Sequence, residues 1–323
     1  MNTKDDLRNN IQLIKDVNNR VPFLWECFDN IIRYKNRSFI DTDIDESVNA
    51  VFQNFISIVK LVPLMAVVID IPQVVRGQKN TKGEPVFSTK SRISYNRSRM
   101  NLIEFGRFNR KGEPLFYASL PTETTNVDYV LSCALECCKE LTAEIRNYKF
   151  QDITVGGWLV KDPFPVINLC FDDEHLKENP ALRTEVHNYL DIIAECFSPE
   201  ASKFIKSFLY YFSELSGTLA ESDFHYFAPT ALFCAIRYYY ENVVEEPKFG
   251  LIYPGAMSDK KGLNIVMTCE AVDRFLKLDK IVMYRYCPVY GGRTDCIAEP
   301  CSDIVHPDKM GNFVITNYKH PAP

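Results

Sequence analysis

Residues 95–109 read YNRSRMNLIEFGRFN. It contains Arg97, Arg99 and Arg107 close together, and Gly106 directly precedes the third of them. An arginine offers a planar fork that binds phosphate oxygens in pairs, and a glycine beside it lets the backbone approach a ligand closely. The stretch therefore indicates a phosphate-binding segment, although an arginine cluster taken alone is more often a solvated face.

Two segments further along the chain carry side chains suited to a nucleotide ligand. Residues 114–119 read PLFYAS, an aromatic run typical of a buried strand, in which Tyr117 offers a ring for stacking on a flat heterocycle. Glu136 lies in the helical run SCALECC (residues 132–138), where small apolar residues flank its carboxylate. A single helical glutamate usually faces solvent, and only the order of the whole set of segments distinguishes Glu136 from such a residue.

That order resembles the RES-domain family, in which an Arg-x-Arg segment, a Gly-Arg-x-Asn segment, an aromatic strand and an Ala-x-Glu helix follow one another. Later segments resemble the family's Tyr-x-x-Thr helix start, its Tyr-Pro strand and its Gly-x-Asn segment. The resemblance covers about residues 94–283. The matching segments are RSR (97–99), GRFN (106–109), GEPLFY (112–117), ALE (134–136), YFAPT (226–230), GLIYP (250–254) and GLN (262–264).

The resemblance implies an α+β fold similar to that of ADP-ribosyltransferases, with a mixed sheet core, helices and a cleft that takes NAD. Residues 1–85 would form an N-terminal helical region. Residues 86–323 would form the NAD-binding and catalytic domain, with a C-terminal extension that contains strands. Many members of the family are intracellular toxins of toxin–antitoxin pairs, so an antitoxin protein is a possible partner.

The implied activity is cleavage of the nicotinamide–ribose bond of NAD, by hydrolysis or phosphorolysis. Nicotinamide leaves as a neutral group, so the reaction needs no strong general acid, and a carboxylate stabilises the positive charge that develops on the ribose. The resemblance assigns the residues as follows. Catalytic residues would be Glu136, Arg107 and Tyr117, and NAD-binding residues would be Arg97, Arg99, Asn109, Tyr253 and Asn264.

One position departs from the family pattern. Where the family has a serine after Tyr-Pro, this chain has Gly255, and the nearest serine is Ser258. Ser258 could take the serine's role in a shifted loop, or the role could be missing. Two alternatives therefore stay open: a module that binds NAD or another nucleotide without turnover, and an enzyme that transfers ADP-ribose to a macromolecule.

Hydrophobic periodicity predicts the secondary structure around these segments. The segment 61–71 fits a buried helix or a strand, and the polar residues 76–91 are predicted to be a linker or an exposed loop. Helices are predicted at 17–34, 44–62, 128–148, 182–196, 198–215 and 229–240, and strands at 114–119, within 158–171, and at 249–253, 263–269, 281–290 and 313–318.

Composition excludes several other classes of protein. The 323 residues have a formal net charge of −5 without long runs of one sign, so no nucleic-acid partner is expected. The longest apolar stretch, residues 58–72, is interrupted by charge and proline, so a soluble cytoplasmic protein is expected. No glycine-rich nucleotide loop is present. Cys287, Cys296 and Cys301 lack the spacing of a zinc knuckle, so no metal is expected.

Overall fold

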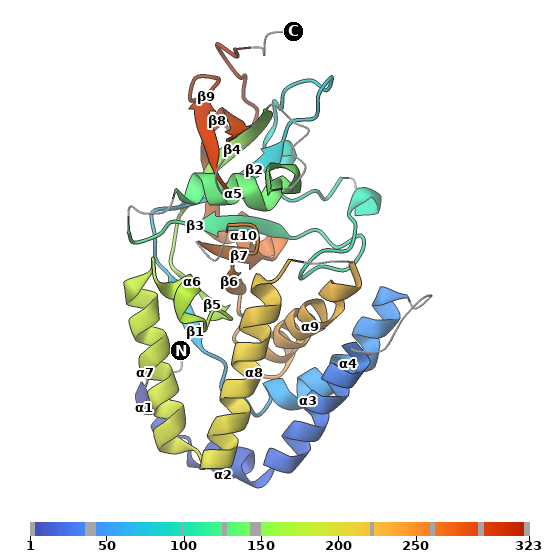
Figure 1. Cartoon of the computed structure of the whole chain (residues 1–323), viewed down its shortest axis with the longest axis vertical. Helices are drawn as coiled ribbons and strands as arrows, with labels where there is room; N and C mark the ends of the chain where they lie inside the picture. The colour runs from blue at the N-terminus through green and yellow to red at the C-terminus, as the bar shows by residue number, and fades with distance from the viewer. Residues whose placement is uncertain are drawn as a thin grey trace.

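A computed structural model of the chain describes residues 4–35, 43–98, 100–124, 128–142, 150–219, 223–258, 262–289 and 294–319. Most helices lie in one half of the molecule, below the sheet in Figure 1, and α5 lies apart from them among the strands. The helices are α1 (Lys4–Asn9), α2 (Ile11–Asn19), α3 (Val21–Lys35), α4 (Ile44–Val59), α5 (Tyr129–Cys137), α6 (Asp173–Leu176), α7 (Pro180–Cys196), α8 (Pro199–Gly217), α9 (Phe227–Asn242) and α10 (Cys269–Phe275).

Nine strands in the described residues form one sheet. The strands are β1 (Ala66–Ile69), β2 (Gln73–Lys79), β3 (Phe116–Leu120), β4 (Gln151–Val160), β5 (Phe164–Asn168), β6 (Gly250–Pro254), β7 (Leu263–Met267), β8 (Leu276–Pro288) and β9 (Cys296–Pro300). Their spatial order is β1-β5-β6-β7-β3-β2-β4-β8-β9. Only β5 and β6 run parallel, and every other neighbouring pair is antiparallel. The prediction of a mixed sheet with helices is therefore confirmed.

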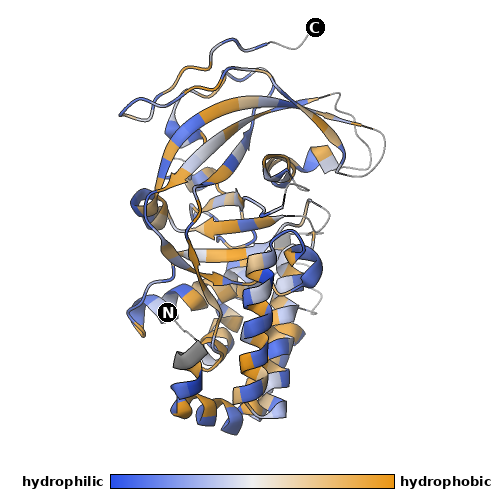
Figure 2. Cartoon of the chain, turned by 90° about the vertical axis from the view of Figure 1, so that its left-hand side faces the viewer, coloured by the Kyte–Doolittle hydropathy of each residue, from blue (hydrophilic) through white to orange (hydrophobic). Residues whose placement is uncertain are grey.

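Two hydrophobic cores pack against this sheet. The larger core joins the helical half to β1, β5, β6, β7 and β3, and Phe55, Phe208 and Phe212 are fully buried in it. The smaller core packs α5 on β2, β4 and β8, where Val75 and Leu135 are buried. Figure 2 shows the helical half carrying hydrophobic and hydrophilic residues side by side, below a curved layer of strands. Burying each large apolar side chain contributes about 1.5–3 kcal/mol.

The two halves of the sheet meet at β2 and β3, which are joined weakly. Their ladder consists of a single register pair, Val75 with Ser119, whereas β2 and β4 pair along the length of β2. Beyond that pair the two strands diverge, and α5 packs against both of them. A gap between strands that a helix partly covers is a natural place for a ligand.

The amino-acid sequence explains where α5 begins and ends. Asp128 is its N-cap, and its carboxylate accepts hydrogen bonds from the backbone N–H groups of Val130 (2.8 Å) and Leu131 (3.2 Å). Such a cap stabilises a helix by about 1 kcal/mol. The helix ends at Cys137, and the backbone of the C-cap residue Cys138 leaves the helical region with φ −142° and ψ 85°. Glu136 therefore lies in the last turn of a short helix, next to the gap.

Several sequence predictions need correction. The predicted linker at 76–91 is wrong at its start, because residues 76–79 continue β2 and pair with β4. Both β1 and β2 precede residue 86, so the sheet begins inside the segment expected to be helical. The strand predicted at 313–318 is absent from the described structure, because its backbone bonds only to scattered groups such as the Ser88 carbonyl and has no ladder partner. Strand β9 was not predicted.

The ambiguous segment 61–71 contains a strand, β1, rather than a helix. The helix predicted at 128–148 is shorter than its apolar pattern suggested. It ends at Cys137, a 3-10 turn covers Lys139–Thr142, and residues 143–149 lie outside the described part of the chain.

Candidate functional site

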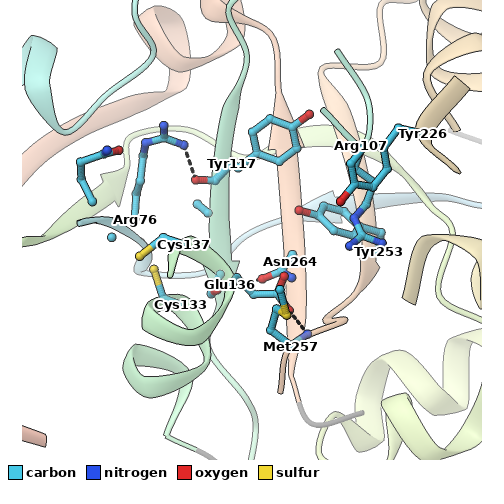
Figure 3. A pocket seen from close by; sticks show the side chains of 14 residues that line it. Arg76, Arg107, Tyr117, Cys133, Glu136, Cys137, Tyr226, Tyr253, Met257 and Asn264 are labelled. Atoms are coloured by element: carbon cyan, nitrogen blue, oxygen red, sulfur yellow. Dashed lines mark hydrogen bonds between the residues drawn. The ribbon is translucent and has the colours of Figure 1, made fainter. Parts of the chain in front are cut away.

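A cavity of about 340 Å³ opens where β2 and β3 diverge. Its wall includes residues of α5, the end of β6, part of β7 and Met257, which follows β6. Five residues predicted from the sequence line this one cavity, although they come from distant parts of the chain (Figure 3). They are Arg107, Tyr117, Glu136, Tyr253 and Asn264.

Glu136 presents a partly buried carboxylate to the cavity. The backbone N–H of Met257 donates a 2.8 Å hydrogen bond to its Oε1. Burial raises the pKa of the Glu136 carboxyl, and the Arg107 guanidinium is the strongest of the influences that lower it. The backbone amides of Met257 and Ala256 and the side-chain amide of Asn264 lower it further, but burial prevails. Burial therefore outweighs the charge and hydrogen bonds around the carboxylate, which lies at the edge of an apolar helix turn.

Arg107 faces the same cavity from a loop and is held by the helical half of the molecule. Its Nη1 donates to the backbone carbonyls of Ser216 and, at 3.1 Å, Thr218, at the C-terminal end of α8. The guanidinium carbon lies 5.6 Å from the Tyr226 ring centroid and 5.9 Å from that of Tyr253. Carbonyls at the end of a helix attract a cation, and aromatic faces add to this attraction. The other guanidinium nitrogens make no hydrogen bond to any described residue.

The Tyr117 hydroxyl fixes the loop that carries Arg107. It donates to Oδ1 of Asn109 (2.8 Å) and accepts from the backbone N–H of Phe108 (3.1 Å). Asn109 is buried, and its amide nitrogen donates to the carbonyls of Glu104 (3.0 Å) and Arg110 (2.9 Å). Asn109 therefore shapes the loop and does not line the cavity, whereas the Tyr117 ring does line it.

Tyr117→Phe is expected to lower the free energy of unfolding by about 1–3 kcal/mol, because it leaves the Phe108 N–H and the Asn109 oxygen unpaired in a buried place. Urea unfolding of both proteins measures the difference. Tyr226→Phe is the matched control, since its hydroxyl makes no hydrogen bond to a described residue, and it is expected to change stability by less than about 0.5 kcal/mol. An equal loss in both variants would contradict the role of Tyr117.

Tyr253 and Asn264 complete the cavity from neighbouring strands, and they oppose each other in the β6–β7 register. The Tyr253 ring packs edge-on against Phe108, with centroids 4.9 Å apart, and burial raises the pKa of its hydroxyl. The Ser119 hydroxyl donates to Oδ1 of Asn264 at 2.8 Å, which turns the amide nitrogen toward the Glu136 side. That nitrogen is buried and makes no well-directed hydrogen bond within the described residues.

The structure separates Arg97 from the cavity. Half of its side chain is exposed, and it forms ion pairs with Glu270 (3.3 Å) and Asp273 (3.4 Å) near α10. Its guanidinium carbon also lies 5.0 Å from the Tyr95 ring centroid. The two acidic partners pair with its charge at the surface. Arg97 therefore belongs to a solvated face and is not an NAD-binding residue of this cavity. Arg99 lies outside the described residues.

Sequence reasoning missed Arg76, which reaches the cavity from β2. Its Nη1 donates to the Tyr117 carbonyl at 2.6 Å, and its guanidinium carbon lies 5.1 Å from the Phe116 ring centroid. Burial lowers the pKa of Arg76, and its Nε has no hydrogen-bond partner among the described residues. The sequence contained a signal for this position. Arg76 follows Val74 and Val75 in an apolar run, a pattern that predicts a strand.

The loop after β6 brings Ser258 to the position that the sequence left open. The Gly255 N–H donates to the Gly262 carbonyl at 3.1 Å, and Gly262 closes the loop with a φ of +103° that favours glycine. A Cβ at residue 255 would lie 2.6 Å from Oγ of Ser258 and 3.1 Å from Oε1 of Glu136. The buried Ser258 hydroxyl thus occupies the space beside Gly255 and lacks a hydrogen-bond partner in the described structure.

Comparisons with known proteins assign no family to this chain. A scan against protein-family models and a search of curated proteins each found no match. Among the described residues, no helix has the length and apolar character needed to cross a membrane. The same residues gather no group of three or more histidine, cysteine, aspartate or glutamate side chains that could hold a metal ion.

Proposed function

We propose that the cavity binds NAD and cleaves its nicotinamide–ribose bond, in a fold similar to that of ADP-ribosyltransferases. One observation carries the proposal: a partly buried carboxylate, Glu136, and a guanidinium, Arg107, face a single cavity without forming an ion pair with each other. Aromatic rings of Tyr117, Tyr226 and Tyr253 line the same space. A ligand that carries phosphate, ribose hydroxyls and a flat heterocycle matches these groups.

The proposed chemistry is dissociative. As the bond to nicotinamide lengthens, positive charge develops on the ribose ring, and the Glu136 carboxylate stabilises that charge in a place from which water is partly excluded. Arg107 and Arg76 supply the positive charge for the pyrophosphate. The backbone N–H of Met257 donates to one carboxylate oxygen and so holds the carboxylate in place beside the ligand.

Nicotinamide release is the direct test. The purified full chain is incubated with NAD, and nicotinamide and the remaining ADP-ribose moiety are separated by chromatography with and without added phosphate. Release above the protein-free control supports the proposal, and ADP-ribose phosphate as product would identify phosphate as the acceptor. An absence of release at micromolar protein with saturating NAD would overturn the catalytic part of the proposal.

The rate should depend on pH through Glu136. Burial raises the pKa of this carboxyl, and only the ionised form stabilises the positive ribose, so activity is lost as pH falls through that raised pKa. The acid limb of kcat/KM is therefore expected at a pH above about 4.3, the ordinary value for glutamate. A pH profile of kcat/KM for nicotinamide release measures it. An acid limb at or below the ordinary value would contradict this environment for Glu136.

A second candidate function is binding of NAD without cleavage, and the glycine at position 255 favours it. If the Ser258 hydroxyl supplies the missing group, Ser258→Ala should lower nicotinamide release about tenfold, the loss expected for one hydrogen bond. Gly255→Ser should not raise release, because its Cβ would lie 2.6 Å from the Ser258 oxygen. Tight NAD binding by wild type without release, together with turnover in Gly255→Ser, would favour the binding module instead.

A further inference from the structure

The α5 side of the cavity carries two thiols that face the same point. Cys133 and Cys137 lie one turn apart on α5, and both line the cavity. A Cβ at residue 77 would lie 3.1 Å from Sγ of Cys137 and 3.3 Å from Sγ of Cys133, so both sulfurs converge over Gly77. Figure 3 shows the two sulfur atoms side by side near the Arg76 side chain. Small apolar residues would pack α5 on β2 equally well, but these two border open space.

The surroundings restrict which chemistry the pair can carry out. Burial raises the pKa of Cys133 to about 11 and that of Cys137 well above its ordinary value, so both groups are neutral S–H groups at neutral pH. A neutral thiol is a poor nucleophile toward peroxide or alkylating agents. A divalent metal ion would have to displace both protons and also approach the positive charge of Arg76. A neutral reagent whose oxygen takes up both thiol protons as the two sulfurs bind needs no free thiolate, and it brings no positive charge close to Arg76.

We propose that Cys133 and Cys137 form a dithiol site for neutral trivalent arsenicals within this cavity. The oxide of a monosubstituted arsenic(III) compound reacts with the two thiols. Two As–S bonds form, the As=O bond breaks, and both thiol protons leave with the oxygen as one water molecule. Arsenic stays trivalent, so the step needs no oxidant or reductant. Cys133, Glu136 and Cys137 line the same cavity, so the bound arsenical occupies part of the space proposed for NAD.

Phenylarsine oxide is the probe, and intact-mass measurement of the folded full chain is the readout. The chain has eleven cysteines, so the evidence is the difference between variants. Cys133→Ser and Cys137→Ser are each expected to weaken one adduct about 100-fold, because a single remaining thiol loses the gain from two-point attachment. Cys138→Ser is the matched control. Its Sγ donates to Oε2 of Glu140 at 3.2 Å and does not line the cavity, so this variant should keep the adduct.

Three further measurements make the outcome decisive. Thermal unfolding verifies that each variant is folded. Cys137→Ala is measured in place of Cys137→Ser if the serine variant does not fold. 2,3-Dimercaptopropanol should remove the adduct, whereas 2-mercaptoethanol at the same thiol concentration should not. Cadmium at the same concentration as the arsenical should bind more weakly. The proposal is overturned if both single variants keep the wild-type adducts, if Cys138→Ser loses one, or if cadmium binds the pair more tightly. None of these readouts requires NAD cleavage.

Discussion

Glu136→Gln is expected to lower the rate of nicotinamide release by about 100- to 1,000-fold, the usual cost of removing one transition-state charge interaction. The amide keeps the size of the side chain and can still accept the hydrogen bond from the backbone N–H of Met257. It loses only the negative charge, which acts on the developing positive charge of the ribose. The loss should therefore appear in kcat, while the dissociation constant for NAD changes little. Single-turnover kinetics and calorimetric NAD binding measure the two effects.

Glu140→Gln is the matched control for this prediction. Glu140 lies only four positions further along the chain, but its Oε1 pairs with the Lys79 amine at 2.5 Å and it does not line the cavity. The control should keep the wild-type rate to within about twofold, since a partly exposed ion pair contributes little to stability. Equal release by wild type and Glu136→Gln would remove Glu136 from the proposed mechanism, whatever the rate of the control.

The strands around the cavity were predictable because they carry their own local signals. Residues 114–119, 249–253 and 263–269 were predicted as strands from short apolar and aromatic runs, and they correspond to β3, β6 and β7. The strand predicted at 313–318 was wrong. Phe313 is buried and Val314 is exposed, which is the alternation of a strand, but the segment has no ladder partner. Local alternation cannot report whether a neighbouring strand exists.

The cavity itself was only partly predictable. The order of the segments predicted five of the residues that line it, but spacing in the sequence did not show that Arg107 lines the cavity and Arg97 does not. What separates them is long-range: the carbonyls at the end of α8 hold Arg107, and acidic residues near α10 hold Arg97. Arg76 was missed for the same reason, because its access to the cavity depends on the divergence of β2 from β3.

Arg107→Ala is expected to lower kcat/KM for NAD by about 100-fold, equivalent to about 2.7 kcal/mol of transition-state stabilisation. A guanidinium that faces the phosphates contributes charge-assisted hydrogen bonds, and part of the loss should appear as a higher KM. Arg107→Lys keeps the charge but not the planar fork, so its kcat/KM should fall between those of wild type and alanine. Steady-state kinetics of the three proteins measure this order, and thermal unfolding reports any loss of the bonds to α8.

Arg97→Ala separates the cavity from the rest of the arginine cluster. Arg97 pairs at the surface with Glu270 and Asp273, so its loss should change kcat/KM by less than about twofold and stability by less than about 1 kcal/mol. The sequence predicted both arginines at the NAD site, Arg107 as a catalytic and Arg97 as a binding residue, and only their positions in the fold separate them. If Arg97→Ala abolished NAD cleavage while Arg107→Ala did not, the ligand would have to bind beside α10, and the cavity between β2 and β3 would lose its proposed role.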